Sequence, residues 1–205
     1  MASKSRVPAA AASEDLSIRF VNTVAWRLRD QAEDRLESGI ALLDWFATAG
    51  LADKAFAASL RKRWVEHPRE EQAFQKSAVK LREAIYLLFA ARIHAGKFDA
   101  AALEILNGVL AARAAGLRIA SAGGTLSWQS GVQPAAAGDL LKPIAWSAAE
   151  LLMGVRSEKL RQCQDERGCG WLFVDESRAQ NRRWCSMGDC GNRAKAQRHY
   201  HRHAS

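Results

Sequence analysis

All four cysteines of this 205-residue chain lie in one stretch, CQDERGCGWLFVDESRAQNRRWCSMGDCGNR, which runs from Cys163 to Arg193. They stand at Cys163, Cys169, Cys185 and Cys190, in the pattern Cys-x5-Cys-x15-Cys-x4-Cys. Two pairs of thiolates on two tight turns supply what a tetrahedral zinc ion requires, because the metal joins the turns. The pattern therefore predicts one Zn2+ ion per chain, held by these four residues.

Other uses of four cysteines fit the sequence less well. Disulfides would suit a secreted chain, but residues 1–15 contain no apolar run of the length that a secretory signal needs, so we expect a reducing, cytoplasmic location. Redox sites use Cys-x-x-Cys, and iron–sulfur clusters use other spacings. His199, His201 or His203 could replace one cysteine as a ligand, and the sequence leaves that alternative open. Four thiolates leave no position for water, so we expect a structural zinc and no enzyme.

The residues between the cysteines predict a small finger over residues 158–203. Gly168 and Gly170 allow the first turn, and residues 171–174 form a strand whose antiparallel partner is residues 182–184. The C-terminal helix begins near Cys190. This order is treble-clef-like, and so small a core should fold only with its metal.

Basic residues follow the cysteines. Residues 178–205 hold seven Lys or Arg residues against one acid, Asp189, in a chain of net charge +8. Such an excess is typical of a surface that binds phosphate backbones, although a solvated basic tail would look the same. Asn192 could read adenine or could fix the turn through bonds to the backbone. The candidate nucleic-acid-binding residues are Arg182, Arg183, Asn192, Arg193, Lys195 and Arg198.

The rest of the chain predicts a helix-dominated domain over residues 14–154, after a disordered start at residues 1–13. Apolar residues at helical spacing indicate helices over residues 36–49, 53–64, 68–95, 99–116 and 139–155. Alternating residues around Gly123-Gly124 indicate a β-hairpin, to which residues 16–21 could add a third strand. The fold class is therefore α+β, and we expect residues 14–154 to hold a core of their own. No apolar run is long enough for a membrane span.

These residues resemble a known family. The matching stretches of the finger are Cys169-Gly170-Trp171-Leu172-Phe173-Val174-Asp175, Ser177-Arg178, Asn181-Arg182-Arg183-Trp184-Cys185-Ser186-Met187 and Cys190-Gly191-Asn192-Arg193. They are similar to the CGNR zinc finger, which takes its name from the last four residues. Phe20-Val21-Asn22-Thr23, Leu81-Arg82-Glu83-Ala84-Ile85-Tyr86 and Leu106-Asn107 resemble the N-terminal α/β domain that accompanies this finger in bacterial proteins, a domain provisionally assigned as a stress-induced transcription regulator.

The resemblance implies a zinc-dependent DNA-binding transcription regulator. Its N-terminal domain would sense a ligand or form a homodimer, and Asn22 and Thr23 are the polar pair that we single out for a ligand. Both side chains could instead serve as a helix cap or turn. The competing interpretation is a zinc-stabilised interaction module that binds protein or RNA without reading DNA sequence.

Overall fold

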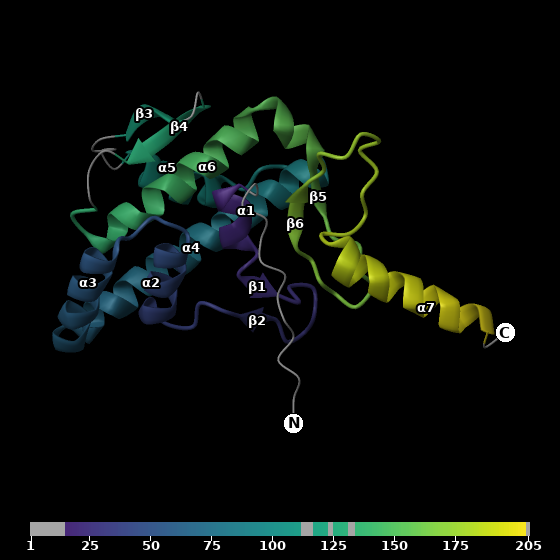
Figure 1. The fold of residues 1–205 in the computed structure, drawn as a ribbon, viewed down its shortest axis with the longest axis horizontal. Coiled ribbons are helices and arrows are strands. Elements are labelled where there is room, and N and C mark those ends of the chain that lie inside the picture. The colour runs from purple at the N-terminus through teal and green to yellow at the C-terminus, as the bar shows by residue number, and fades with distance from the viewer. Residues whose placement is uncertain (1–14, 112–116, 123–124, 131–133, 204–205) are drawn as a thin grey trace.

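The computed structural model describes residues 15–111, 117–122, 125–130 and 134–203 (Figure 1). The predicted disordered start at residues 1–13 and the predicted turn at Gly123-Gly124 lie outside these residues. The first half contains α1 (Leu16–Val21), β1 (Val24–Ala25), β2 (Glu33–Asp34), α2 (Gly39–Thr48), α3 (Lys54–Glu66), α4 (Pro68–Ile93) and α5 (Ala100–Ala111). The second half contains β3 (Leu117–Ala122), β4 (Thr125–Ser130), η1 (Ala137–Leu141), α6 (Lys142–Met153), η2 (Val155–Lys159), β5 (Leu160–Gln162), β6 (Leu172–Val174), η3 (Met187–Gly191) and α7 (Asn192–His203).

Helix α4 is the centre of the fold. It runs through the middle of the molecule, and α1, α2, α3, α5, α6 and β5 all pack against it (Figure 1). Its buried positions recur at helical spacing, because one stripe of a 3.6-residue period faces the core. That stripe consists of Phe74, Ala78, Leu81, Ile85 and Leu88. No helix in the described residues is both long and apolar enough to cross a membrane.

The predicted helix starts are confirmed by their caps. The carboxylate of Asp53 accepts a hydrogen bond from the Phe56 N–H at 2.7 Å, and Asp99 accepts one from the Ala102 N–H at 2.7 Å. Both bonds satisfy N–H groups that a first helical turn leaves without a backbone partner. Pro68 occupies the first position of α4, as the sequence predicts.

Residues 16–21 do not add a strand to the hairpin, so that prediction was wrong. They form helix α1, and Ile18, Phe20 and Val21 are all buried. The segment packs against both α4 and α6, so side chains from several sides of its short helix reach the core. A helix buried in this way loses the polar face that would have distinguished it from a strand. Strands β3 and β4 pair antiparallel with each other, and with no other strand of the described residues.

The strand pairing in the finger also differs from the prediction. Strand β6 pairs antiparallel with β5, not with residues 182–184. The Arg182 N–H instead donates to the buried carboxylate of Asp175 at 2.8 Å, so it is unavailable for a strand ladder. Leu160 of β5 and Leu172 of β6 both belong to the main core, and burying them favours the observed pair.

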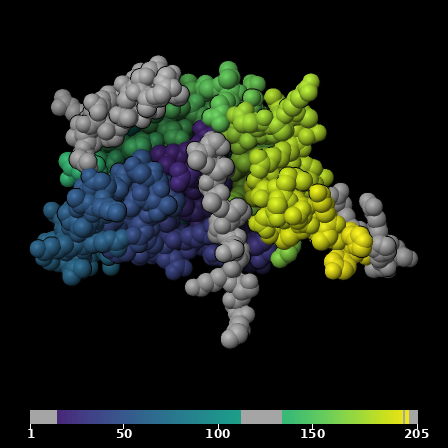
Figure 2. Space-filling view, viewed as in Figure 1, coloured from purple at the N-terminus to yellow at the C-terminus, as the bar shows by residue number. Residues whose placement is uncertain are grey.

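The finger therefore shares its core with the preceding helices. Leu160 and Leu172 are in the same buried cluster as Phe20 and Leu81, and β6 also contacts α1. In the space-filling view the finger lies directly against the rest of the molecule (Figure 2). Because the two parts share one core, we expect the N-terminal domain to depend on the finger for part of its stability.

Candidate metal centre and its surroundings

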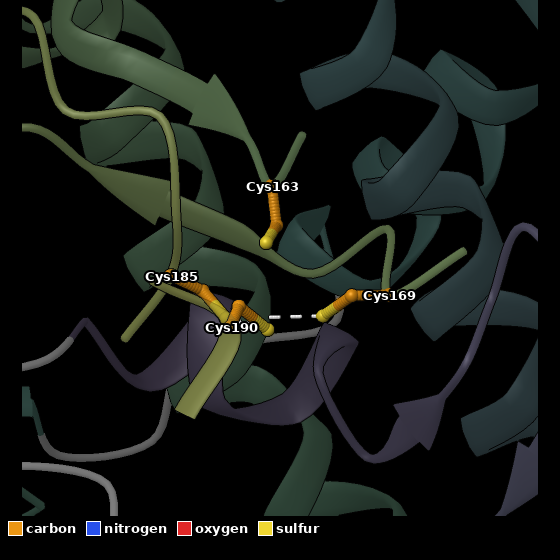
Figure 3. A group of neighbouring side chains, drawn as sticks. All are labelled: Cys163, Cys169, Cys185 and Cys190. Atoms are coloured by element: carbon orange, nitrogen blue, oxygen red, sulfur yellow. Dashed lines mark hydrogen bonds between the residues drawn. The ribbon is translucent and has the colours of Figure 1, made fainter. Parts of the chain in front are cut away.

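The four cysteine sulfurs converge on one point (Figure 3). All four Sγ atoms lie within 4.8 Å of one another, and none is in a disulfide. The Cys169–Cys185 and Cys185–Cys190 sulfur separations are 3.8 and 3.6 Å. Zinc–thiolate bonds of about 2.3 Å in a tetrahedron place the sulfurs about 3.8 Å apart, so the cluster fits one zinc ion. Cys163, Cys169 and Cys190 are buried and Cys185 is half-buried, which also fits a closed site.

The electrostatics of the cluster favour a cation between the sulfurs. The contact with Cys163, followed by those with Cys169 and Cys190, raises the pKa of the Cys185 thiol above its ordinary value. Hydrogen bonds from its three cysteine neighbours lower the pKa of Cys163 instead. Four thiols packed this closely cannot all ionise without a positive charge between them, and a divalent ion removes that restriction.

Two glycines shape the first zinc turn, residues 163–169: Gly168 within it and Gly170 directly after it. Gly168 has φ +85° and Gly170 has φ +67°, a left-handed conformation that glycine adopts without strain. Space matters here as well. A Cβ on Gly170 would lie 2.7 Å from Cγ of Leu28, and one on Gly168 would lie 2.9 Å from Cγ of Arg29. The glycines therefore let another part of the chain approach the cysteine backbone.

That part is residues 26–29, which we call the docking loop. The Arg27 N–H donates to the Cys169 carbonyl at 3.1 Å, and the Leu28 N–H donates to the Gly168 carbonyl at 3.2 Å. Just before the loop, the Val24 carbonyl accepts a bond from the Trp171 indole at 2.9 Å. The backbone of the zinc turn is thus hydrogen-bonded to a segment about 140 residues earlier in the chain, a contact that sequence reasoning missed.

Arg193 belongs to the metal centre. Its Nη2 lies 2.8 Å from Sγ of Cys190 and 3.0 Å from a carboxylate oxygen of buried Asp165, and its Nη1 pairs with Asp189. A guanidinium beside a thiolate stabilises the charge of the ligand, and Asp165 and Asp189 fix the guanidinium. The side chain that was predicted to bind nucleic acid is therefore engaged inside the finger.

Replacing Arg193 with Ala should lower zinc affinity about 10- to 100-fold, because it removes a partner that orients and stabilises the Cys190 thiolate. Competition with a chromogenic chelator under reducing conditions measures this affinity. Lys195→Ala is the matched control, because Lys195 is exposed on the same helix and should leave zinc affinity unchanged. Equal affinities of the two variants would contradict this role for Arg193.

The other predicted basic residues divide into two groups. Arg182 turns inward: Nε donates to the Trp184 carbonyl at 2.8 Å, and the guanidinium also bonds the Cys185 carbonyl. Arg183 is exposed and bonds the Gln164 amide oxygen at 2.8 Å. Lys195 is exposed on α7, the helix that also carries Arg198. Arg183 and Lys195 therefore remain available for a partner.

Asn192 fixes the second zinc turn, residues 185–190. Its amide donates to the Gly188 carbonyl at 3.1 Å, one helical turn earlier. This is the second of the two roles that the sequence allowed, a side-chain bond that holds local backbone.

Asn22 and Thr23 are occupied by the protein itself. The Asn22 amide donates to the Leu172 carbonyl at 2.8 Å and accepts from the Leu172 N–H at 2.9 Å. The Thr23 hydroxyl donates to the Phe20 carbonyl at 2.7 Å. Both residues are buried, so Asn22 joins α1 to β6 and Thr23 closes α1, and neither presents a free group to a ligand.

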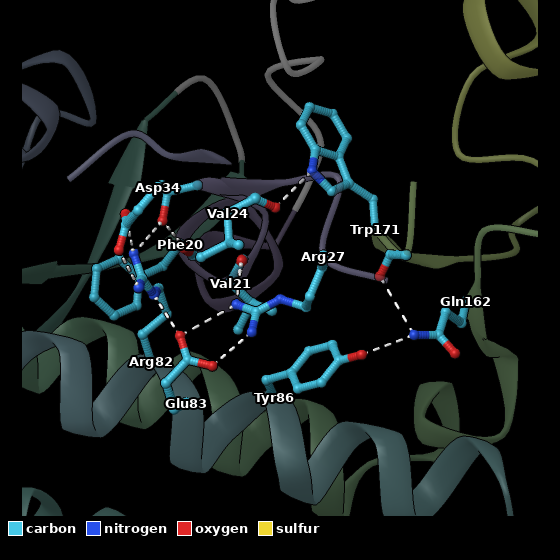
Figure 4. Close-up of polar contacts among 12 residues, drawn as sticks. Phe20, Val21, Val24, Arg27, Asp34, Arg82, Glu83, Tyr86, Gln162 and Trp171 are labelled. Carbon is cyan, nitrogen blue, oxygen red and sulfur yellow. Dashed lines mark hydrogen bonds and ion pairs between the residues drawn. The ribbon is translucent and has the colours of Figure 1, made fainter. Parts of the chain in front are cut away.

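A polar network connects the docking loop to α4 (Figure 4). Arg82 is 2% exposed, pairs with Asp34 of β2 at 2.7 Å, and also bonds Glu83 at 2.9 Å. Glu83 in turn pairs with Arg27 of the docking loop at 2.5 Å. Sequence reasoning did not single out this network, although Arg82 follows buried Ala78 by one helical turn and so had to face inward.

Arg27 also reaches the finger. Its guanidinium carbon lies 4.1 Å from the centre of the Tyr86 ring, and the Tyr86 hydroxyl accepts a bond from the Gln162 amide at 2.8 Å (Figure 4). Gln162 is in β5, directly before Cys163. The docking loop, α4 and the first strand of the finger are therefore joined through polar side chains.

The fold and the four-thiolate site define a zinc-finger protein whose finger is built onto a helical domain. Residues 14–155 match the ABATE family, described as "Putative stress-induced transcription regulator", and residues 159–203 match the CGNR zinc finger. The family match covers more than half of the chain, so the chain belongs to the ABATE family and carries a CGNR zinc finger. No curated protein matches the chain.

Proposed function

We propose that this protein is a transcription regulator that binds DNA through its zinc finger. The observation that carries the proposal is the position of α7. This helix follows directly from the last zinc ligand and extends away from the body of the molecule (Figure 1). A helix held by a metal at one end and projecting from the body of the molecule is suited to lie against a duplex.

The charge of the finger supports the same function. Asp189, the one acid of residues 178–205, is paired with Arg193, so it does not neutralise the other cations of that segment. Lys195 makes no ion pair with the described residues and is exposed. A cationic segment of this kind attracts the phosphate backbone whatever the base sequence.

Zinc has a structural role in this proposal. Four protein thiolates leave no position for a water or substrate, so the metal holds the finger and performs no reaction. The affinity for DNA would come from Arg183, Lys195 and Arg198, and not from Arg182 or Arg193, which the finger uses internally.

The wild-type protein should bind a DNA duplex with an affinity that falls with salt at a log–log slope of roughly −3 to −5, since each phosphate contact releases about one counterion. Replacing Lys195 and Arg198 with Ala should reduce the steepness of the slope by about 2 and leave the zinc content unchanged. Fluorescence anisotropy at several salt concentrations measures both slopes.

The matched control is Lys62→Ala combined with Arg69→Ala. It removes the same charge from exposed positions in α3 and the first turn of α4, the end of the molecule opposite the finger (Figure 1). The control should keep the wild-type slope. A wild-type protein that binds no duplex, or a Lys195/Arg198 variant that behaves as the control does, would favour the interaction module for protein or RNA.

A further inference from the structure

The docking loop begins with a strained tryptophan. Trp26 has φ +54°, a left-handed conformation that is a genuine outlier for so bulky a residue. The turn closes when the Arg29 N–H donates to the Trp26 carbonyl at 2.9 Å. The ring packs on the buried cluster that contains the cysteines. Such strain is kept only where the surroundings hold the residue in place.

The turn holds Arg29 in a fixed and exposed position. Its guanidinium carbon lies 3.6 Å from the centre of the Trp26 ring, which indicates stacking, and its Nε donates to the Arg167 carbonyl at 2.6 Å. Its two terminal amino groups bond none of the described residues, and the side chain is exposed. A guanidinium with its plane fixed and its outer edge free is prepared for a bidentate contact with a phosphate.

Arg167 lies beside it on the first zinc turn. Its guanidinium carbon is 5.8 Å from the Trp26 ring centre, and it is exposed without an ion pair to any described residue. The nearby acids are mostly engaged: Asp165 and Asp189 pair with Arg193, and Glu166 accepts a bond from Gln197. Asp30 is the adjacent exposed acid, so two cations face solvent beside one free carboxylate.

This group of residues adjoins α7. Arg193, in the first turn of that helix, has its guanidinium carbon 5.1 Å from the Trp26 ring centre. One turn further along, Gln197 bonds Glu166, the neighbour of Arg167. The first two turns of α7 therefore lie against the docking loop and the first zinc turn.

We propose that Arg29 and Arg167 form a second phosphate-binding surface, beside the first turns of α7, that contacts the backbone of the same DNA duplex. Trp26 is a positioning residue that holds Arg29 in place. The proposal rests on the proposed function, because it extends the DNA contact from the finger to the N-terminal domain. The helical domain would thus be part of the DNA-binding surface.

The test uses the double variant Arg29→Ala/Arg167→Ala, and the Lys62→Ala/Arg69→Ala variant is its control. Both are measured as full-length, zinc-loaded protein. The first variant should bind a duplex about tenfold more weakly near 0.15 M salt and lose about 2 from the steepness of its salt slope. Its zinc content and far-UV circular dichroism should match wild type. The control should match wild type in every measurement.

Arg167→Gln is a second variant that should keep the fold, because the Arg167 guanidinium makes no hydrogen bond or ion pair with the described residues and only a distant contact with the Trp26 ring. It should lose about 1 from the slope. Wild-type affinity in both the double variant and Arg167→Gln would overturn the second surface while leaving the proposed function intact. A wild-type protein that binds no duplex would refute the proposed function, and this inference with it.

Discussion

Removal of zinc with a chelator should release the docking loop as well as the finger, and should lower the melting temperature by at least about 10 °C. The sequence alone suggests a smaller effect, in which only the finger unfolds. The structure changes this expectation because the carbonyls of Gly168 and Cys169 accept the N–H groups of Leu28 and Arg27. Once the metal no longer fixes the zinc turn, those bonds lose their acceptors, and Leu160 and Leu172 lose the constraint that holds them in the main core.

Hydrogen exchange resolved by residue gives the decisive measurement. The amides of Arg27 and Leu28 should exchange rapidly after chelation, whereas amides within α3, which packs at the far end of α4, should remain protected. Adding zinc back under reducing conditions should restore protection. If Arg27 and Leu28 stay protected while α7 loses its structure, the finger and the docking loop are independent, and the coupling described above is wrong.

Replacing Arg82 with Ala should reduce the free energy of unfolding by about 3 kcal/mol. Arg82 is buried and bonds Asp34, Glu83 and the Thr23 hydroxyl. Its removal leaves Asp34 without its main partner, leaves Glu83 with Arg27 alone, and opens a gap beside α1. Chemical denaturation measures the change. Arg61→Ala is the matched control: it breaks an exposed pair with Asp44 and should cost less than about 1 kcal/mol. Equal costs for the two variants would show that the buried network adds no stability.

The same network predicts how stability depends on pH. Burial raises the pKa of Asp34, but hydrogen bonds from Arg82 and the Leu36 N–H outweigh it, so the pKa lies below its ordinary value. For Glu83, burial likewise raises the pKa, but the hydrogen bonds and charges of Arg27 and Arg82 outweigh it, so this pKa also lies below its ordinary value. Folded-state pKa values below the unfolded ones mean that this stabilisation is present above about pH 4 and is lost as the pH falls further. The Arg82→Ala variant should lose less stability than wild type over that acid range.

Local signals in the sequence were sufficient for much of the fold. The caps at Asp53 and Asp99 and the proline at position 68 define helix starts through bonds between neighbouring residues, and such bonds can be read from a single sequence. The zinc ligands could also be predicted from the sequence, because the spacing of the cysteines reflects the geometry of the turns directly.

The errors concern pairs of residues that are distant in the chain. Nothing local in Leu160–Gln162 marks it as the partner of β6, and a strand of three residues has too short a pattern to be recognised. Arg193 is of a residue type that commonly contacts DNA, and only its contacts with Asp165 and Cys190 show that it serves the metal centre. The docking loop has no motif of its own, because its role depends on carbonyls about 140 residues away.

The pair of hydrogen bonds between Asn22 and Leu172 has a consequence for folding during synthesis. The two residues are separated by 150 positions, so the ribosome releases the Asn22 amide long before the strand that it binds. Until the last fifth of the chain emerges, α1 lacks the backbone that completes its end, and this long-range contact closes late. A chain that terminates before Leu172 would leave a polar side chain and part of the apolar core uncovered. Proteases should therefore degrade truncated products. The N-terminal part of the protein would then persist only when the zinc-binding end has also been synthesised.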